Sequence, residues 1–250
     1  MNMKNIESFN QTQLFGLEEY FKELYFLYKD GNLPNKLLLS GPKGQGKSTL
    51  AYHFINYVLS KDEDFQYDVG KYKINTENRT FKTILNKSNP NLISININKD
   101  KKSIDINQIR DLISNLKKSS FNKKPRFVLI DDIEFLNINS INALLKILEE
   151  PSDNIHFILI NNNKKILSTL SSRCINFKIF LSNKKNLDIA NNLLDGNLTN
   201  LINKDLINYY STPGNIYNLA KFGNENDYDL INLDLKQFLK KIIHNHHYKK

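Results

Sequence analysis

The sequence predicts an α/β protein with a central parallel sheet, followed by a smaller region that is all helical. Two observations support this fold class. Short apolar runs typical of buried strands alternate with amphipathic helical patterns up to about residue 180. From about Leu181 only helical patterns recur, separated by glycine and proline. We therefore expect an α/β domain over 1–180, a helical domain over 181–223, and a C-terminal helix over 224–250.

The first predicted unit consists of a strand, a turn and a helix. Residues 37–39 are an apolar run that ends in Ser40-Gly41-Pro42, which indicates a buried strand and a tight turn. A helix is predicted from Ser48 to about Ser60, because apolar residues recur there at three- and four-residue spacings. Residues 61–90 are polar and show no clear period. The next predicted strand covers 91–96.

The alternation then continues to about residue 180. Asp105 is predicted to cap a helix, with Gln108 three residues later as its capping-box partner and an apolar stripe behind it. Pro151 is predicted to stop a later helix. The remaining elements are strands over 126–130, 156–160 and 174–180, and helices over 140–150, 187–194, 216–222 and 228–243, with Gly196 and Pro213-Gly214 as breakers.

The turn after the first strand carries a phosphate-binding motif. Residues 41–48 fit GxxxxGK[ST], in which glycines let backbone N–H groups surround a phosphate. Lys47 is predicted to reach the β and γ oxygens of a nucleotide, and the Ser48 hydroxyl to bind Mg²⁺. A glycine-rich turn without function is the alternative, but the flanking strand and helix favour the nucleotide site. The predicted nucleotide contacts are Gly41, Gly44, Gln45, Gly46, Lys47, Ser48 and Thr49.

A second nucleotide motif is predicted at the end of the strand over 126–130. Asp131 follows that strand and is expected to hold Mg²⁺, while Asp132 is the candidate base that polarises a water molecule. Aspartate is one methylene shorter than the glutamate that is usual there, so nucleotide binding is better supported than hydrolysis. The alternative for both residues is a solvated turn or a helix cap. A full strand and helix separate the two motifs, so we expect their strands not to be neighbours in the sheet.

Composition excludes several classes of protein. The net charge is +9, from 35 Lys+Arg against 26 Asp+Glu, yet only Arg79, Arg110, Arg126 and Arg173 are arginines. Lysine and asparagine have AT-rich codons, so the charge by itself is weak support for a nucleic-acid partner. A single cysteine, Cys174, excludes internal disulfides and four-cysteine zinc sites. No apolar run is long enough for a membrane helix and no signal peptide is visible, so we expect a cytoplasmic protein without a membrane partner.

Several motifs in order resemble one family. NALLKILEEP over 142–151 follows the strand that ends in two aspartates, and a strand ending at Asn161 and then Ser172-Arg173-Cys174 come next. This series resembles the clamp-loader ATPases of bacterial replication, and Leu14-Phe15-Gly16 adds similarity to the delta-prime branch. The resemblance covers about residues 10–222. It implies an AAA+ fold with a helical lid, in a hetero-oligomeric ring of clamp-loader subunits that places a sliding clamp on primed DNA.

The resemblance also implies roles for individual residues. Asn161 would be the sensor of the γ-phosphate, and Arg173 would be an arginine finger that reaches the ATP of a neighbouring subunit. An ordinary surface or capping arginine is the alternative for Arg173. Cys174 is expected to be a small apolar residue that enters a strand.

The sequence differs from the family's usual pattern in three places. Residues 61–90 contain no cysteine, so no zinc is expected beside ATP and Mg²⁺. Gly214 and Asn215 stand where related lids often have an arginine, which weakens the case for hydrolysis. About 25 residues follow the lid, so the family's helical collar is expected to be reduced or truncated. The intact phosphate loop, Asp131-Asp132, NALLKILEEP and Ser172-Arg173-Cys174 in order favour a delta-prime-type subunit, and a gamma/tau-like motor or a scaffold with a vestigial phosphate loop are the alternatives.

Overall fold

The structure, a computed structural model, describes residues 6–97, 101–118, 122–149, 154–207 and 211–249. The chain divides into two compact units. One contains Ile6–Pro42 and Lys47–Ile179, and the other contains Lys43–Gly46 and Phe180–Lys250.

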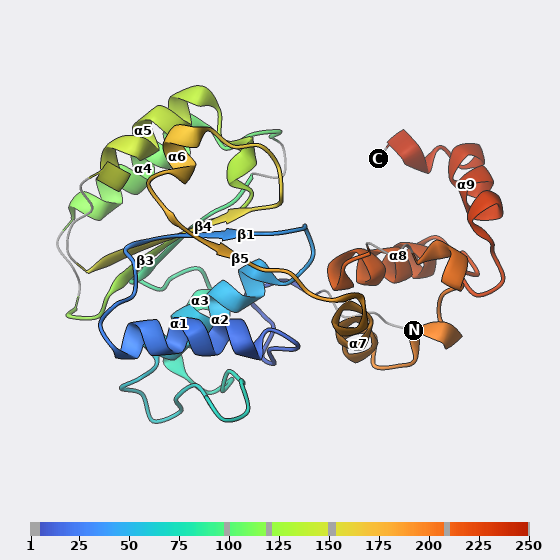
Figure 1. The fold of residues 1–250 in the computed structure, drawn as a ribbon, viewed down its shortest axis with the longest axis horizontal. Helices are drawn as coiled ribbons and strands as arrows, with labels where there is room; N and C mark the ends of the chain where they lie inside the picture. Colours follow the sequence, from blue (N-terminus) through green and yellow to red (C-terminus); the bar gives the residue numbers. More distant parts are fainter. Residues whose placement is uncertain (1–5, 98–100, 119–121, 150–153, 208–210, 250) are drawn as a thin grey trace. The chain divides into compact units, whose positions relative to one another are not determined.

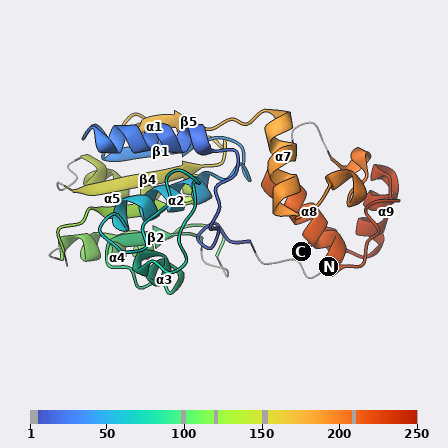
Figure 2. The same cartoon turned by 90° about the horizontal axis from the view of Figure 1, so that it is seen from below.

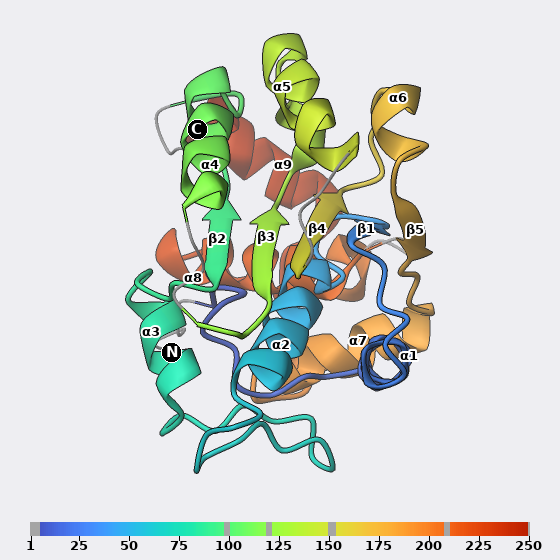
Figure 3. The ribbon, with the colours of Figure 1, turned by 90° about the vertical axis from the view of Figure 1, so that its left-hand side faces the viewer.

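The larger unit is built on a five-stranded parallel sheet, as the sequence predicts. The strand order is β2-β3-β4-β1-β5, and Figure 3 shows the strands side by side. Strand β4 lies between β1, which leads into the phosphate loop, and β3, which ends before Asp131. The prediction that these two strands are not neighbours is confirmed. The strands are β1 (Lys36–Ser40), β2 (Leu92–Ile95), β3 (Arg126–Ile130), β4 (Ile155–Asn161) and β5 (Ile175–Lys178).

Helices cover both faces of this sheet (Figure 1). One face carries α1 (Glu18–Lys29) and α2 (Lys47–Leu59), and the other carries α4 (Ile106–Lys117), α5 (Ile138–Glu149) and the short α6 (Ser168–Ser171). Burial on two faces explains why residues 127–130 of β3 are all apolar instead of alternating with polar residues. A core cluster joins α4, α5 and α6 to the sheet, and it includes Leu112, Leu144, Leu148, Phe157 and Leu170.

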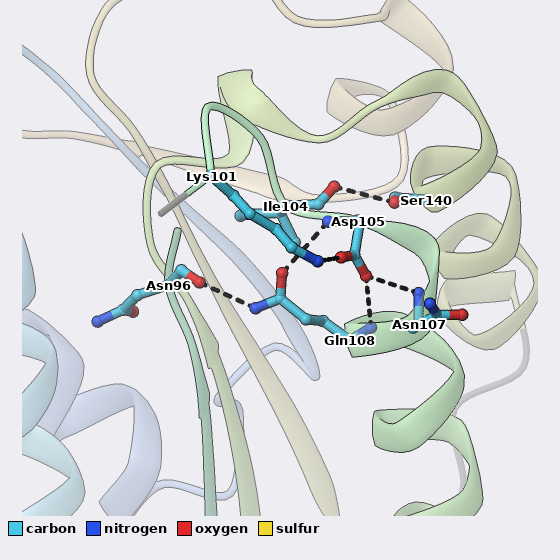
Figure 4. A network of polar contacts seen from close by, with 7 residues as sticks. All are labelled: Asn96, Lys101, Ile104, Asp105, Asn107, Gln108 and Ser140. Carbon is cyan, nitrogen blue, oxygen red and sulfur yellow. Dashed lines mark hydrogen bonds and ion pairs between the residues drawn. The ribbon is translucent and has the colours of Figure 1, made fainter. Parts of the chain in front are cut away.

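The start of α4 is fixed by the capping box that the sequence predicts (Figure 4). The Asp105 carboxylate accepts from the backbone N–H groups of Asn107 and Gln108, and the Gln108 side chain accepts from the Asp105 N–H. Lys101 forms an ion pair with Asp105, and the Gln108 amide donates to the Asn96 carbonyl at 3.0 Å. These contacts satisfy N–H groups that a helix leaves unpaired at its start and tie α4 to the end of β2.

Helix α3 (Arg79–Leu85) lies in the stretch where the sequence predicts no element. It has only seven residues, too few for a clear helical period. Asn78 caps it by accepting from the Phe81 N–H at 2.6 Å, and the Asn78 amide pairs with Asn56 inside the protein. Tertiary contacts therefore fix this helix, because isolated helices of this length are not stable in water.

The described part of the smaller unit contains helices and no strand, as expected from about Leu181 onward (Figure 2). Pro213-Gly214 was predicted as a breaker, but it begins a helix, since Thr212 is the N-cap and proline suits the first turn. The last long helix begins at Leu235 and not near residue 228, because Asp234 caps it with Gln237. The elements are α7 (Asn183–Leu193), α8 (Pro213–Glu225) and α9 (Leu235–His244), and the short helices η2 (Leu198–Asn200), η3 (Lys204–Leu206) and η4 (His247–Lys249).

Glu150 and Pro151, predicted to mark the end of a helix, lie outside the described residues. Helix α5 is described to Glu149. Among the helices in the described ranges, none combines the length and the apolar character needed to cross a membrane.

Candidate functional site

The polar residues predicted as a site follow three strands of the sheet. Residue pairs align Ser40 of β1 with Asn161 of β4, and Ile130 of β3 with Leu159 of β4. Since the strands are parallel, the phosphate loop, Asp131 and the end of β4 come out at the same edge of the sheet. In open α/β sheets ligands bind outside the carboxyl ends of the strands.

The glycines of the phosphate loop occupy conformations that favour glycine. Gly41, Gly44 and Gly46 have φ values of 152°, 84° and 82°. A side chain at these positions would strain the backbone, so the three predicted glycines are required by the shape of the loop. Gly41 also donates its N–H to the Asn161 carbonyl at 3.3 Å, which ties the start of the loop to the end of β4.

Lys47 binds the backbone at the start of the phosphate loop. Its side chain is buried, and Nζ donates to the carbonyls of Gly41 at 2.9 Å and Pro42 at 2.7 Å. A buried ammonium requires such acceptors, because an unpaired charge would be costly away from water. A phosphate bound in the loop would offer stronger, charged acceptors to the same ammonium. Thr49 is half-buried in the first turn of α2.

Ser48, in the first turn of α2, lies beside Asp131, which directly follows β3, and these are the two predicted magnesium ligands. Burial and the nearby Asp132 carboxylate raise the pKa of Asp131, whereas the Asp132 N–H, the Ser48 hydroxyl and the Lys47 charge act in the opposite direction. The Asp132 N–H donates to Asp131 Oδ1 at 2.8 Å. A divalent cation at this point would favour the ionised carboxylate.

Asp132 contacts Asn162. Its backbone is left-handed, with φ 55° and ψ 45°, at the N-cap of the short helix η1 (Ile133–Phe135). Asn162 Nδ2 donates to Asp132 Oδ1 at 2.5 Å, and the Asn162 N–H donates to Glu134 Oε2 at 3.3 Å. Asn162 therefore links the end of β4 to the segment that follows β3.

Asn161, the predicted sensor, is buried and forms a turn of its own. Its Nδ2 donates to the Lys164 carbonyl at 2.9 Å, and its Oδ1 accepts from the Lys164 N–H at 3.2 Å. The structure thus brings Asn162, and not Asn161, against Asp132. The sensor role of Asn161 stays a prediction, while its observed contacts shape the backbone that places Asn162.

Arg173, the predicted finger, follows α6. Its Nη2 donates to Glu149 Oε1 at 2.6 Å and its Nη1 donates to the Thr169 carbonyl at 2.8 Å. The next residue, Cys174, is partly buried against the core cluster, and burial raises the pKa of its thiol to about 11. A neutral thiol is a poor nucleophile, in agreement with its expected packing role.

The smaller unit includes the tip of the phosphate loop. Within this unit, the Thr212 hydroxyl donates to the Lys43 carbonyl at 2.7 Å, and the Gly214 N–H donates to the Gly44 carbonyl at 2.9 Å. A Cβ added to Gly214 would lie 2.8 Å from Gly44 Cα. Gly214 is thus needed for a close approach of two backbones, and it could not be replaced by an arginine without movement.

The donor set suits a nucleotide and a hard cation. Loop N–H groups and the Lys47 ammonium are donors for phosphate oxygens, and the Ser48 hydroxyl and Asp131 carboxylate are oxygen ligands of the kind that Mg²⁺ prefers. Together with a parallel sheet in which β4 separates β1 from β3, these residues define a P-loop ATPase fold of the AAA+ class.

Comparison with known proteins then gives the family. The family model described as DNA polymerase III, delta subunit matches residues 16–182. The chain belongs to this family.

The sequence identity to individual relatives is low. The chain is 30% identical over 139 residues to DNA polymerase III subunit delta' of Pseudomonas aeruginosa, which is 55% of this chain and 40% of that protein. It is 29% identical over 158 residues to DNA polymerase III subunit gamma of Buchnera aphidicola subsp. Schizaphis graminum, which is 63% of this chain and 41% of that protein. The matches therefore span less than half the length of these relatives.

Among solved structures, the chain is similar to the Thermotoga maritima RuvB Holliday junction branch migration motor. The TM-score is 0.47 and the sequence identity is 20%, over 94% of this chain and 72% of that one.

The contacts of two residues near the site, Asn162 and Glu149, were not predicted from the sequence. Asn162 is the middle residue of the run 161–163, and nothing in the sequence shows which asparagine faces Asp132. Glu149 belongs to the quoted motif NALLKILEEP, but its pairing with Arg173 joins residues that are 24 positions apart. The sequence motifs indicated the region of each residue, and only the fold identified the contacting atoms.

Proposed function

We propose that the chain is a clamp-loader subunit of the DNA polymerase III holoenzyme, of the delta-prime type. It binds ATP with Mg²⁺ and offers Arg173 to the ATP of a neighbouring subunit. Its partners are the other subunits of a hetero-oligomeric ring, the sliding clamp, and primed DNA that it approaches through the complex. This proposal places the protein in the cytoplasm. Family membership and the names of the delta' relatives support it.

The observation that carries the ATP proposal is the proximity of Ser48 to Asp131 at the exit of the phosphate loop. These residues lie 83 positions apart in the sequence, and the fold brings them together beside the buried Lys47. A glycine-rich turn without function would not need a hydroxyl and a carboxylate at its exit. In our proposal Ser48 and Asp131 hold Mg²⁺, Lys47 neutralises phosphate charge, and the loop N–H groups orient the phosphates. Bound ATP supplies the γ-phosphate.

In this proposal, each of the three segments expected from the sequence has its own role. Residues 1–180 act as the nucleotide-binding domain, 181–223 as the lid, and 224–250 contribute a helix to a collar. Arg173 acts in trans as a finger, since a guanidinium can bind two phosphate oxygens at once.

A gamma/tau-like motor subunit is the second candidate. The contact between Asn162 and Asp132 favours it, because a held carboxylate is what a hydrolytic site needs to polarise water. Gamma and tau subunits are also among the relatives. The two candidates differ in whether this chain itself turns over ATP.

The deciding experiment uses the purified chain and fluorescent ATP with Mg²⁺. Tight binding with negligible turnover supports the delta-prime type, whereas robust turnover that is lost in Lys47→Ala supports the motor. In either case Lys47→Ala should weaken ATP binding by roughly 10- to 100-fold, because it removes charge-assisted hydrogen bonds. Lys22→Ala, an exposed lysine on α1, is the matched control and should bind as the unaltered chain does.

Absence of ATP binding at millimolar concentration would support the scaffold alternative and contradict the ATP proposal. Membership of the ring is tested separately, by co-purifying the chain with the other DNA polymerase III subunits and counting its copies in each complex.

A further inference from the structure

The guanidinium of Arg173 is held in place within its own subunit. Nη2 donates to the carboxylate of Glu149 at 2.6 Å, and Nη1 donates to the backbone carbonyl of Thr169 at 2.8 Å. The two anchors belong to different elements, since Glu149 is the last residue of α5 and Thr169 lies in α6. One anchor is charged and the other is neutral.

Both anchors stand next to fully buried core residues. Leu148, beside Glu149, is 0% exposed, and Leu170, beside Thr169, is 1% exposed. Both leucines belong to the cluster that joins α5 and α6 to the sheet. The core of the larger unit therefore fixes the backbone at Glu149 and Thr169, while the Arg173 and Glu149 side chains are 34% and 53% exposed.

This arrangement leaves the guanidinium able to bind an anion. Two of its five N–H donors are used in these contacts, so the others can still reach a phosphate. A partly exposed ion pair adds little to stability, because water screens the charges. A long arginine side chain, however, loses much rotamer freedom when it is fixed, and a pair that fixes it beforehand reduces that loss on binding.

We propose that Glu149 is a positioning residue for Arg173. Its carboxylate, together with the Thr169 carbonyl, holds the guanidinium in one orientation before a neighbour's nucleotide is met. The inference rests on the proposed role of Arg173 as a finger in trans. Glu149 itself contacts no nucleotide and acts through Arg173.

The test compares Glu149→Ala with Glu149→Gln in the assembled complex with the other subunits. Loss of the carboxylate in Glu149→Ala should lower kcat for ATP roughly 3- to 10-fold and leave KM nearly unchanged. Glu149→Gln keeps an acceptor for Nη2 and should recover most of the rate. Glu23→Ala removes an exposed glutamate on α1, on the opposite face of the sheet, and is the matched control.

A double variant separates action through Arg173 from other effects. If Glu149 acts through Arg173, adding Glu149→Ala to Arg173→Ala should cause no further loss of rate. Additive losses would overturn the proposal, and so would an unchanged rate in Glu149→Ala. A faster rate would also overturn it, since the carboxylate would then restrain Arg173 and not position it.

A second measurement does not depend on activity. The chain has four arginines, so its side-chain Nε–H groups give few signals in nitrogen-15 NMR spectra, and Arg173→Ala identifies the one of interest. That signal should be rigid in the unaltered subunit and mobile in Glu149→Ala. If Arg173→Ala leaves the ATPase rate of the complex unchanged, the finger proposal fails. An equally mobile signal with and without Glu149 would overturn the positioning proposal independently.

Discussion

Asn162 donates a hydrogen bond from Nδ2 to Oδ1 of Asp132 at 2.5 Å, across the carboxyl ends of β4 and β3. The contact connects the residue proposed as a base with the strand that lies between it and the phosphate loop. Asn161, its neighbour in the sequence, binds the Lys164 backbone instead. Two adjacent asparagine side chains therefore have different hydrogen-bond partners.

This difference predicts distinct effects of two alanine substitutions. Asn162→Ala removes one donor to Asp132 and should reduce the preference for ATP over ADP about three- to tenfold, as expected for one hydrogen bond. Asn161→Ala removes the two bonds to Lys164 and should lower the free energy of unfolding by about 1–3 kcal/mol. Competition binding and urea unfolding measure the two effects. Equal nucleotide preference in Asn162→Ala and the unaltered chain would exclude Asn162 from recognition of the γ-phosphate.

Gly214 is predicted to be intolerant of a side chain. Gly214→Ala would place a Cβ 2.8 Å from Gly44 Cα and 3.1 Å from the Gly44 oxygen. The resulting overlap should cost about 1–3 kcal/mol, because both neighbours are backbone atoms. Gly196→Ala, in the same unit, meets nothing closer than 3.7 Å and is the control. Thermal unfolding should show a lower midpoint for Gly214→Ala only, and similar midpoints would contradict the close approach.

His53 predicts a loss of stability at acid pH. It is fully buried, with Nδ1 2.9 Å from the Tyr67 hydroxyl and Nε2 3.1 Å from the Gln11 carbonyl. Burial lowers its pKa to about 4. Between pH 6.5 and 4 the unfolded chain then binds a proton that the folded chain does not, so stability falls as the pH falls. The loss should reach about 3 kcal/mol below pH 4.

Chemical denaturation at several pH values measures this dependence. His53→Gln cannot be protonated and should flatten the profile between pH 6.5 and 4. Burial also lowers the pKa of His156, so a smaller slope of the same sign should remain. An unchanged slope in His53→Gln would show that other groups cause the acid sensitivity.

Cys174 should react slowly with alkylating reagents. Its pKa of about 11 leaves little thiolate at neutral pH, whereas an unfolded chain has the ordinary value near 8.5 to 9. Iodoacetamide at pH 7.5 should therefore modify the folded chain about 100-fold more slowly than the chain in urea. Mass spectrometry follows the single modification, and equal rates would contradict the burial of this thiol.

The sequence by itself determined the parallel α/β architecture, the separation of the two nucleotide strands, and the capping box at Asp105. These features depend on local patterns, such as apolar runs and the spacing of Asp105 and Gln108. The positions of Lys47, Ser48 and Asp131 were predictable for a related reason. They follow directly on strands, and parallel strands bring their carboxyl ends to one edge.

Only the tertiary structure decided which atoms meet across long distances in the chain. Helix α3 was missed because its seven residues are held by the buried pair of Asn56 and Asn78. Pro213-Gly214 begins α8, since Thr212 caps it and Gly214 approaches Gly44. The choice of Asn162 over Asn161, and the pairing of Glu149 with Arg173, depend on how strands end and helices pack. A sequence pattern sets which residues lie at an edge of the sheet, but the direction of each side chain there is fixed by its neighbours in space.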